Sequence, residues 1–201
     1  MGQYFHPLVL KKGWKQAKNP VVASLSSYDF NHNGAKLVEH SYIGNSFVKA
    51  AEYLLADDYK GYPFVWIGDY ADSVETKTGT HDLYIDSSNF IYEDYDSPYN
   101  DRLSEAYEAL KDSIPNNVRY YKYLVNYTKK EYCVIPEFKE GEYQIHPLPL
   151  LTCNGNGRGG GDYLLEDERV GTWAFDKIGV TNDESEIVGF KEINGFFELN
   201  W

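Results

Sequence analysis

The second half of the chain is dominated by short apolar runs separated by turn residues, and this pattern most limits the folds open to it. The runs VRYYKYLVNY and EYCVI flank a turn at Thr128, Lys129 and Lys130, and GTWAFDKIGV, EIVGFKEI and GFFELNW follow. Tyr, Val, Ile and Phe at this density are typical of strands. From residue 118 onward we therefore expect mainly antiparallel β-structure.

Two segments have the spacing of amphipathic helices instead. Asn45 is a good N-cap, and apolar residues recur at helical spacing from Phe47 to Ala56. A second helix is predicted over residues 98–114, because Pro98 suits a first turn and Pro115 ends the pattern. With 201 residues, 42% of them hydrophobic, the chain can bury one core. We expect a single α+β domain over residues 1–201, with about two main helices.

The first half contains further candidate strands. YFHPLVL and AKLVEH alternate apolar and polar residues, and Asn33-Gly34 between them is a hairpin signal. PFVWIGDYAD predicts a central strand that ends near Asp69 and Asp72, and residues 82–96 are predicted to add strand or edge structure. Residues 146–152, HPLPLLT, are predicted to begin in an extended conformation.

The charge balance limits the partners. Nineteen basic residues against 31 acidic ones give a formal net charge of −12. Such a molecule repels phosphate backbones and anionic membranes at long range. We therefore expect no direct nucleic-acid binding and no membrane partner.

The expected compartment is the cytoplasm. Two cysteines, Cys133 and Cys153, do not make a disulfide framework, and the first residues lack the apolar run of a signal peptide. No stretch is apolar over the length needed to cross a bilayer. Although the chain begins Met-Gly, position 6 is His6, where a myristoylation signal has Ser or Thr.

A glycine-rich loop, TCNGNGRGGGDYL at residues 152–164, is the strongest candidate for a binding element. Gly155, Gly157 and Gly160 match G-x-G-x-x-G, but no long amphipathic helix follows, and no G-K-[ST] sequence supplies a P-loop lysine. What remains is an anion-binding nest of backbone N–H groups with Arg158 beside it. The same composition also fits a purely structural bend.

The local charge limits the chemical classes of ligand that the glycine-rich loop can bind. Between residues 146 and 180, three basic residues face five acidic ones, which leaves −2. Any anion site must therefore be local, and a ligand with a sugar or base as well as a phosphate fits better. The predicted contacts are Gly157, Gly159 and Gly160 through their N–H groups, Arg158 to phosphate, Asn154, Asn156 or Asp162 to sugar hydroxyls, and Tyr163 and Trp173 as stacking partners.

Metal sites have weaker support. Asp29, Asn31 and Asn33 imitate the start of a calcium loop, but the twelfth position is His40 and the bidentate ligand is missing. A hydrolytic site could be built from three histidines and three aspartates, although their spacing matches no metal motif: His40, His81, His146, Asp69, Asp72 and Asp82. We predict no metal and no cofactor.

Nucleophilic catalysis is not indicated either. Ser46 begins a helix without the G-x-S-x-G elbow, and neither cysteine lies in a catalytic motif. No catalytic residue is predicted. The acidic groups at residues 93–96 and 166–168 are expected to be solvated faces, which could also imitate nucleic acid for a partner enzyme.

Several stretches resemble an uncharacterised family of small bacterial and phage proteins whose chains begin MGQY. The matching stretches are KLVEHSYIGNSFV, VWIGDYAD, HPLPLLT, GNGRGGGDY and VGTWAFDKIGV. The resemblance implies a phage or prophage origin, and with it a role in evading host defence. It implies no mechanism.

These observations together predict a cytoplasmic, phage-related binding protein that sequesters a small nucleotide-like ligand. Two alternatives stay open: a protein-binding inhibitor or acidic mimic of nucleic acid, acting on a host protein, and a metal-dependent phosphodiesterase. The oligomeric state does not follow from the sequence.

Overall fold

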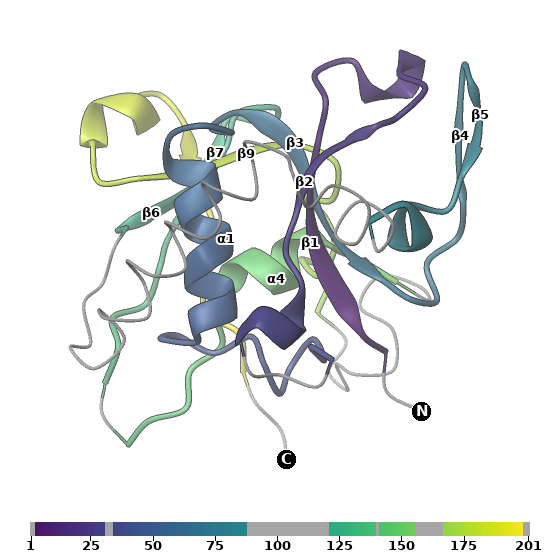
Figure 1. The fold of residues 1–201 in the computed structure, drawn as a ribbon. Coiled ribbons are helices and arrows are strands. Elements are labelled where there is room, and N and C mark those ends of the chain that lie inside the picture. Colours follow the sequence, from purple (N-terminus) through teal and green to yellow (C-terminus); the bar gives the residue numbers. More distant parts are fainter. Residues whose placement is uncertain (1–2, 31–33, 88–120, 140, 156–166, 199–201) are drawn as a thin grey trace.

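A computed structural model of the chain describes residues 3–30, 34–87, 121–139, 141–155 and 167–198 (Figure 1). These residues form an α+β fold around one mainly antiparallel mixed sheet, which confirms the predicted fold class. No helix in these ranges has the length and apolarity to cross a membrane.

The main sheet has the strand order β10-β7-β6-β9-β3-β1-β2, with β8 paired to β3 beside this path. Its strands are β1 (Phe5–Leu10), β2 (Val21–Ser24), β3 (Tyr62–Gly68), β6 (Tyr123–Asn126), β7 (Glu131–Val134), β8 (Cys153–Asn154), β9 (Lys177–Thr181) and β10 (Lys191–Glu192). A separate hairpin joins β4 (Val74–Thr76) to β5 (Gly79–His81). The helical elements include α1 (Ser46–Ala56), α4 (Pro147–Thr152) and the 3-10 turns η1 (Trp14–Gln16), η2 (Ser27–Phe30) and η5 (Glu184–Ile187).

Strand β3 is the centre of the sheet, as its apolar run predicts. Along one side it pairs antiparallel with β1, from Phe5 opposite Gly68 to Val9 opposite Phe64. Along the other side its first residues pair antiparallel with β9, and its last residues pair parallel with β8. The neighbour of β3 therefore changes halfway along the strand.

Both faces of the sheet are covered. Phe64 and Trp66 of β3 belong to the core cluster that includes the apolar residues of α1 and α4. Val65 and Ile67, on the opposite face, cluster with Trp14 and Leu83. Full burial of one such side chain contributes about 1.5–3 kcal/mol, so this strand is a main source of stability.

Helix α1 begins where the sequence indicates. The Asn45 side-chain oxygen accepts the N–H groups of Phe47 at 2.8 Å and Val48 at 3.3 Å. The helix ends at Ala56, as predicted. The strands on either side of the turn at residues 128–130 are confirmed as β6 and β7.

Several local predictions are wrong. Of the predicted strand at residues 171–180, residues 171–175 form turns and only the end belongs to β9. Residues 35–40 form turns rather than a strand, so no strand follows Gly34 to complete the hairpin. Residues 83–87 are helical, and residues 195–198 belong to no strand. His146 is extended, as predicted, but it is the N-cap of a helix, α4, rather than the start of an extended run. The helix predicted over residues 98–114 lies outside the described residues.

Candidate functional site

The two ends of the glycine-rich segment are held together by backbone hydrogen bonds. The Gly171 N–H donates to the Leu150 carbonyl at 2.8 Å, and the Trp173 N–H donates to the Leu151 carbonyl at 2.7 Å. These bonds join the last turn of α4 to the segment that precedes β9. The residues on either side of the glycine-rich segment are therefore held close together, like a stem.

The loop leaves the sheet beside the carboxyl end of β3. Strand β8 runs parallel to β3, with Cys153 opposite Trp66 and Asn154 opposite Ile67. Gly155 then follows β8 at the same edge at which Gly68 ends β3. In open, mostly parallel α/β sheets, ligands bind at the carboxyl ends of neighbouring parallel strands where strand pairing changes; here the parallel pair is two residues long in a mainly antiparallel sheet. We call this place the β3–β8 edge and define it by Asp69, Asn154, Gly155, Tyr4 and Tyr70.

Asp69 is fixed at this edge by the start of β1. The Tyr4 N–H donates to Asp69 Oδ1 at 3.2 Å, and the Asp69 N–H donates to the Tyr4 carbonyl at 2.9 Å. This reciprocal pair places a carboxylate directly after the strand. A carboxylate is an acceptor with about four sites for hydrogen bonds.

Gly155 has a packing role of its own. A Cβ atom on Gly155 would lie 2.4 Å from Gln3 Oε1, and one on Gly68 would lie 2.8 Å from the same atom. Gln3 is buried, so its amide has little room to move away. At least the first glycine of the loop is therefore required by close packing, whatever the loop binds.

Two tyrosines give the edge exposed aromatic surface. The Tyr4 residue is 41% exposed and Tyr70, two residues beyond β3, is 51% exposed. Gly34 lies against the Tyr4 ring, since a Cβ there would come within 2.4 Å of Tyr4 Cδ1. Aromatic surface beside hydrogen-bond acceptors is the usual composition of a site for a sugar or base.

The structure describes only two of the nine predicted ligand contacts. Asn154 lies in β8 at the β3–β8 edge, half-buried. Trp173 is in the core, 1% exposed, so its ring offers no free face to a ligand. The other seven lie outside the described residues: Asn156, Gly157, Arg158, Gly159, Gly160, Asp162 and Tyr163.

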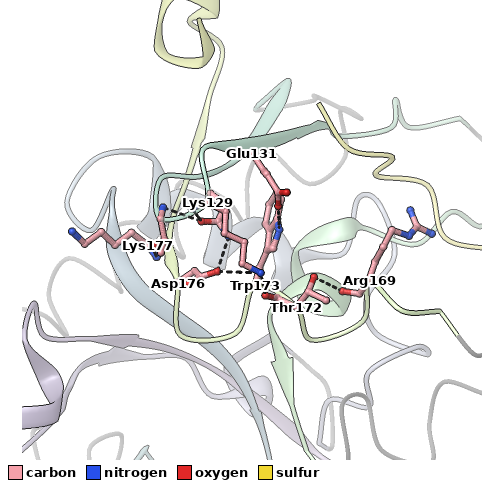
Figure 2. Close-up of polar contacts among 9 residues, drawn as sticks. Lys129, Glu131, Arg169, Thr172, Trp173, Asp176 and Lys177 are labelled. Atoms are coloured by element: carbon pink, nitrogen blue, oxygen red, sulfur yellow. Dashed lines mark hydrogen bonds and ion pairs between the residues drawn. The ribbon is translucent and has the colours of Figure 1, made fainter. Parts of the chain in front are cut away.

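Trp173 instead organises the turn that follows the loop (Figure 2). Its Nε1–H donates to Glu131 Oε2 at 3.0 Å. Lys129 Nζ lies 2.5 Å from the Thr172 carbonyl oxygen and 3.8 Å from Asp176 Oδ2. The turn is thereby bound to β7 and to the β6–β7 turn.

Arg169 holds the end of the loop that leads back to the core. Its guanidinium donates from Nε and a terminal nitrogen to the two oxygens of Asp167, at 2.9 and 2.5 Å. It also donates to the carbonyls of Asn194 and Phe196 and lies over the Phe197 ring, 4.3 Å from its centroid. The hydrogen bonds from Arg169 lower the pKa of Asp167. Arg169 is thus engaged structurally.

The histidines of the suggested metal set are bonded to different partners. His40 Nδ1 accepts the Lys36 N–H at 3.0 Å, and His81 Nδ1 lies 3.1 Å from Asp86 Oδ2. His146 Nε2 lies 3.0 Å from Glu52 Oε1. Among the described residues, no three His, Cys, Asp or Glu side chains are grouped so that they could hold a metal ion. The phosphodiesterase alternative therefore has no ligand set in this part of the chain.

The pair of His146 and Glu52 is a buried link that the sequence did not reveal. The Leu148 N–H donates to His146 Nδ1 at 3.1 Å, which caps α4. Because Nδ1 accepts, the proton of the neutral ring is on Nε2 and is donated to Glu52. Both side chains are almost fully buried. The pair joins α1 to α4 and is too enclosed to reach a ligand.

The cysteines are not nucleophiles. Cys133 and Cys153 are both free and buried. Burial raises the pKa of the Cys153 thiol to about 12 and raises the pKa of the Cys133 thiol as well. Thiolate is the reactive form, so neither sulfur is activated at neutral pH.

In comparisons with protein-family models, curated proteins and solved structures, no match to the chain was found.

Proposed function

We propose that the protein binds a small nucleotide-like ligand, bearing ribose and phosphate, at the β3–β8 edge and in the glycine loop that leaves it. The observation that carries the proposal is the position of Asn154 and Gly155. They begin the loop at the carboxyl end of the parallel pair β3 and β8, beside Asp69. The role is binding and sequestration, without turnover.

The hydrogen bonds that hold the two ends of the glycine-rich segment together favour a binding loop over a flexible linker. Ordering five glycines over residues 155–161 costs conformational entropy, which bound ligand or packing must offset. Packing accounts for Gly155 through Gln3. For the later glycines, the proposed offset comes from ligand atoms that approach the backbone N–H groups.

Charge decides how the ligand is oriented. The charged side chains that directly follow β3 are Asp69 and Asp72, which repel a phosphate. Asp69 and Asn154 are therefore assigned to the hydroxyl groups of the sugar, and Tyr4 or Tyr70 to the base. Arg158 then neutralises the phosphate from within the loop, as a charge-assisted pair.

The biological setting of this proposal comes from the family resemblance. A cytoplasmic phage or prophage protein that withdraws a nucleotide-like molecule from the host would act against a defence that depends on that molecule. Identification of the bound ligand tests this part of the proposal.

Calorimetric titration of the wild type and Arg158→Ala tests the proposal. The panel contains adenosine, AMP, ADP, cyclic mono- and dinucleotides and ADP-ribose. Loss of a charge-assisted hydrogen bond of roughly 1.5–3 kcal/mol should weaken binding of the best phosphate-bearing compound about ten- to one-hundred-fold. The control is Lys139→Ala, an exposed cation bonded to Glu142, which should bind like the wild type.

The melting temperature without ligand should be the same for both variants. If no compound on the panel binds the wild type, or if Arg158→Ala binds the best one equally well, the glycine loop is a structural bend and the proposal fails.

A further inference from the structure

A group of lysines projects from the sheet at the end opposite the β3–β8 edge. The β1–β2 connection, residues 11–20, carries Lys11, Lys12, Lys15 and Lys18, and the β4–β5 hairpin carries Lys77. Figure 1 shows the two connections extending from the same side of the molecule. We call residues 11–20 and 74–81 together the lysine tip.

The two halves of the tip are fixed to each other. The Lys77 N–H donates to the Lys15 carbonyl at 2.8 Å, and the Thr78 hydroxyl donates to the Ala17 carbonyl at 2.8 Å. Trp14 anchors the first half, because it is buried and its ring stacks on Phe175 with centroids 5.4 Å apart. The backbone that carries the lysine side chains is therefore held in place by these contacts.

The tip contrasts with the rest of the chain in charge. Its five lysines and one acid, Glu75, give +4, which leaves −16 on the remainder of a chain of net −12. The five lysines are exposed. The tip is thus a positive projection on an acidic protein.

The tip lysines differ in their partners from five of the nine other lysines in the described ranges. Lys36, Lys60, Lys122, Lys129 and Lys139 each form an ion pair with a carboxylate. Within the described ranges, none of the five tip lysines does so, although Lys12 and Lys15 lie over the rings of Tyr62 and Trp14. Like charges gathered without counter-charges destabilise a fold slightly, so their arrangement fits an external anion.

We propose that the lysine tip docks an acidic segment of a partner protein. The proposal is independent of the nucleotide site. A nucleic-acid duplex would bring its dense negative charge close to a body of −16, whereas a peptide segment can meet the tip alone. The tip also lacks arginines for bidentate phosphate contacts and exposed aromatic rings for stacking bases.

Fluorescence anisotropy with a fluorescein-labelled decaglutamate peptide tests this surface. Saturable binding that weakens between 20 and 150 mM NaCl is expected. The triple variant Lys15→Gln, Lys18→Gln and Lys77→Gln should bind about three- to one-hundred-fold more weakly, from three exposed ion pairs. The control triple Lys36→Gln, Lys122→Gln and Lys139→Gln changes the net charge equally and should bind within about twofold of the wild type.

Several outcomes would overturn the proposal. Equal weakening by both triples would mean that net charge alone matters. Absence of saturable binding, or tighter binding of a DNA duplex than of the peptide, would exclude an acidic protein segment. A dimer in ultracentrifugation that the tip triple abolishes, without peptide binding, would assign the tip to a second copy of this chain. Lys18→Gln alone, expected to weaken binding about 1.5- to 5-fold, gives a readout if the triple variant does not fold.

Discussion

Replacement of Glu52 by leucine should be among the most destabilising single changes in α1. Glu52 accepts the Nε2–H of His146 at 3.0 Å, and both side chains are almost fully buried. Its carboxylate also stabilises the charged form of the nearby Lys49, whose pKa is lowered by burial and raised by Glu52. Leucine has similar volume, so the test isolates the polar interaction.

The expected loss of stability comes from the interactions of Glu52 that Glu52→Leu removes. A buried donor without a partner, here the His146 Nε2–H, costs about 1–3 kcal/mol. Loss of the attraction to Lys49 adds up to about 1 kcal/mol. The sum is about 1–4 kcal/mol, which lowers the melting temperature by about 2–16 °C in a chain of this size. Glu52→Gln keeps an acceptor oxygen and should cost less than half as much.

Urea denaturation at pH 7 measures the free energy of unfolding of the wild type, Glu52→Leu and Glu52→Gln. Glu39→Leu is the matched control, because Glu39 is paired with Lys36 at the surface and its loss should cost no more than about 1 kcal/mol. Equal stabilities of Glu52→Leu and the wild type, or equal losses for leucine and glutamine, would refute a hydrogen-bonded link between α1 and α4.

Three further predictions follow from the described contacts. Asn45→Ala should lower the free energy of unfolding by about 1 kcal/mol through loss of the cap of α1, measured by urea denaturation, and an unchanged midpoint would contradict the cap. Arg169→Ala should cost about 2 kcal/mol or more. Since the pKa of Asp167 is lowered, this cost is complete above about pH 4 and declines as the pH falls through the lowered pKa, which thermal melts between pH 2 and 7 would show. Cys133 and Cys153 should not react with a thiol reagent in the native protein at pH 8 but should react fully in urea; fast native labelling would show that they are not buried.

The parts of the fold that the sequence predicted are those in which local pattern and tertiary environment agree. In α1, the Asn45 cap and the apolar spacing point to the same boundaries. In β3, a continuous apolar run fits a strand that is buried on both faces.

Elsewhere the alternation of apolar residues was read correctly as burial but wrongly as a strand. Ala35 and Leu37 are buried, although residues 35–40 form turns. Phe197 is buried and Phe196 exposed in a segment whose carbonyls are bound by the Arg169 side chain instead of a neighbouring strand. A segment in which every second residue is buried forms a β-strand only where another strand pairs with it. A single sequence does not show which segments pair.

Helix α4 was missed because its two prolines suggest extended chain. Pro147 and Pro149 occupy the first turn, where a missing N–H breaks no helical hydrogen bond. His146 is an unusual N-cap, and its Nε2–H donates to Glu52, 94 residues away. The closeness of Asn154 to Asp69 likewise depends on long-range pairing of β8 with β3, which residue spacing could not indicate.

Amide NMR of the wild type, titrated with the tightest-binding compound of the nucleotide panel, tests the central claim most directly. Binding at the β3–β8 edge predicts the largest shifts at Tyr4, Asp69, Asn154 and Gly155, with the amide of Lys77 in the lysine tip unchanged. Saturable shifts confined to other surfaces, or no shifts with any compound of the panel, would contradict the assignment of a nucleotide-like ligand to this edge.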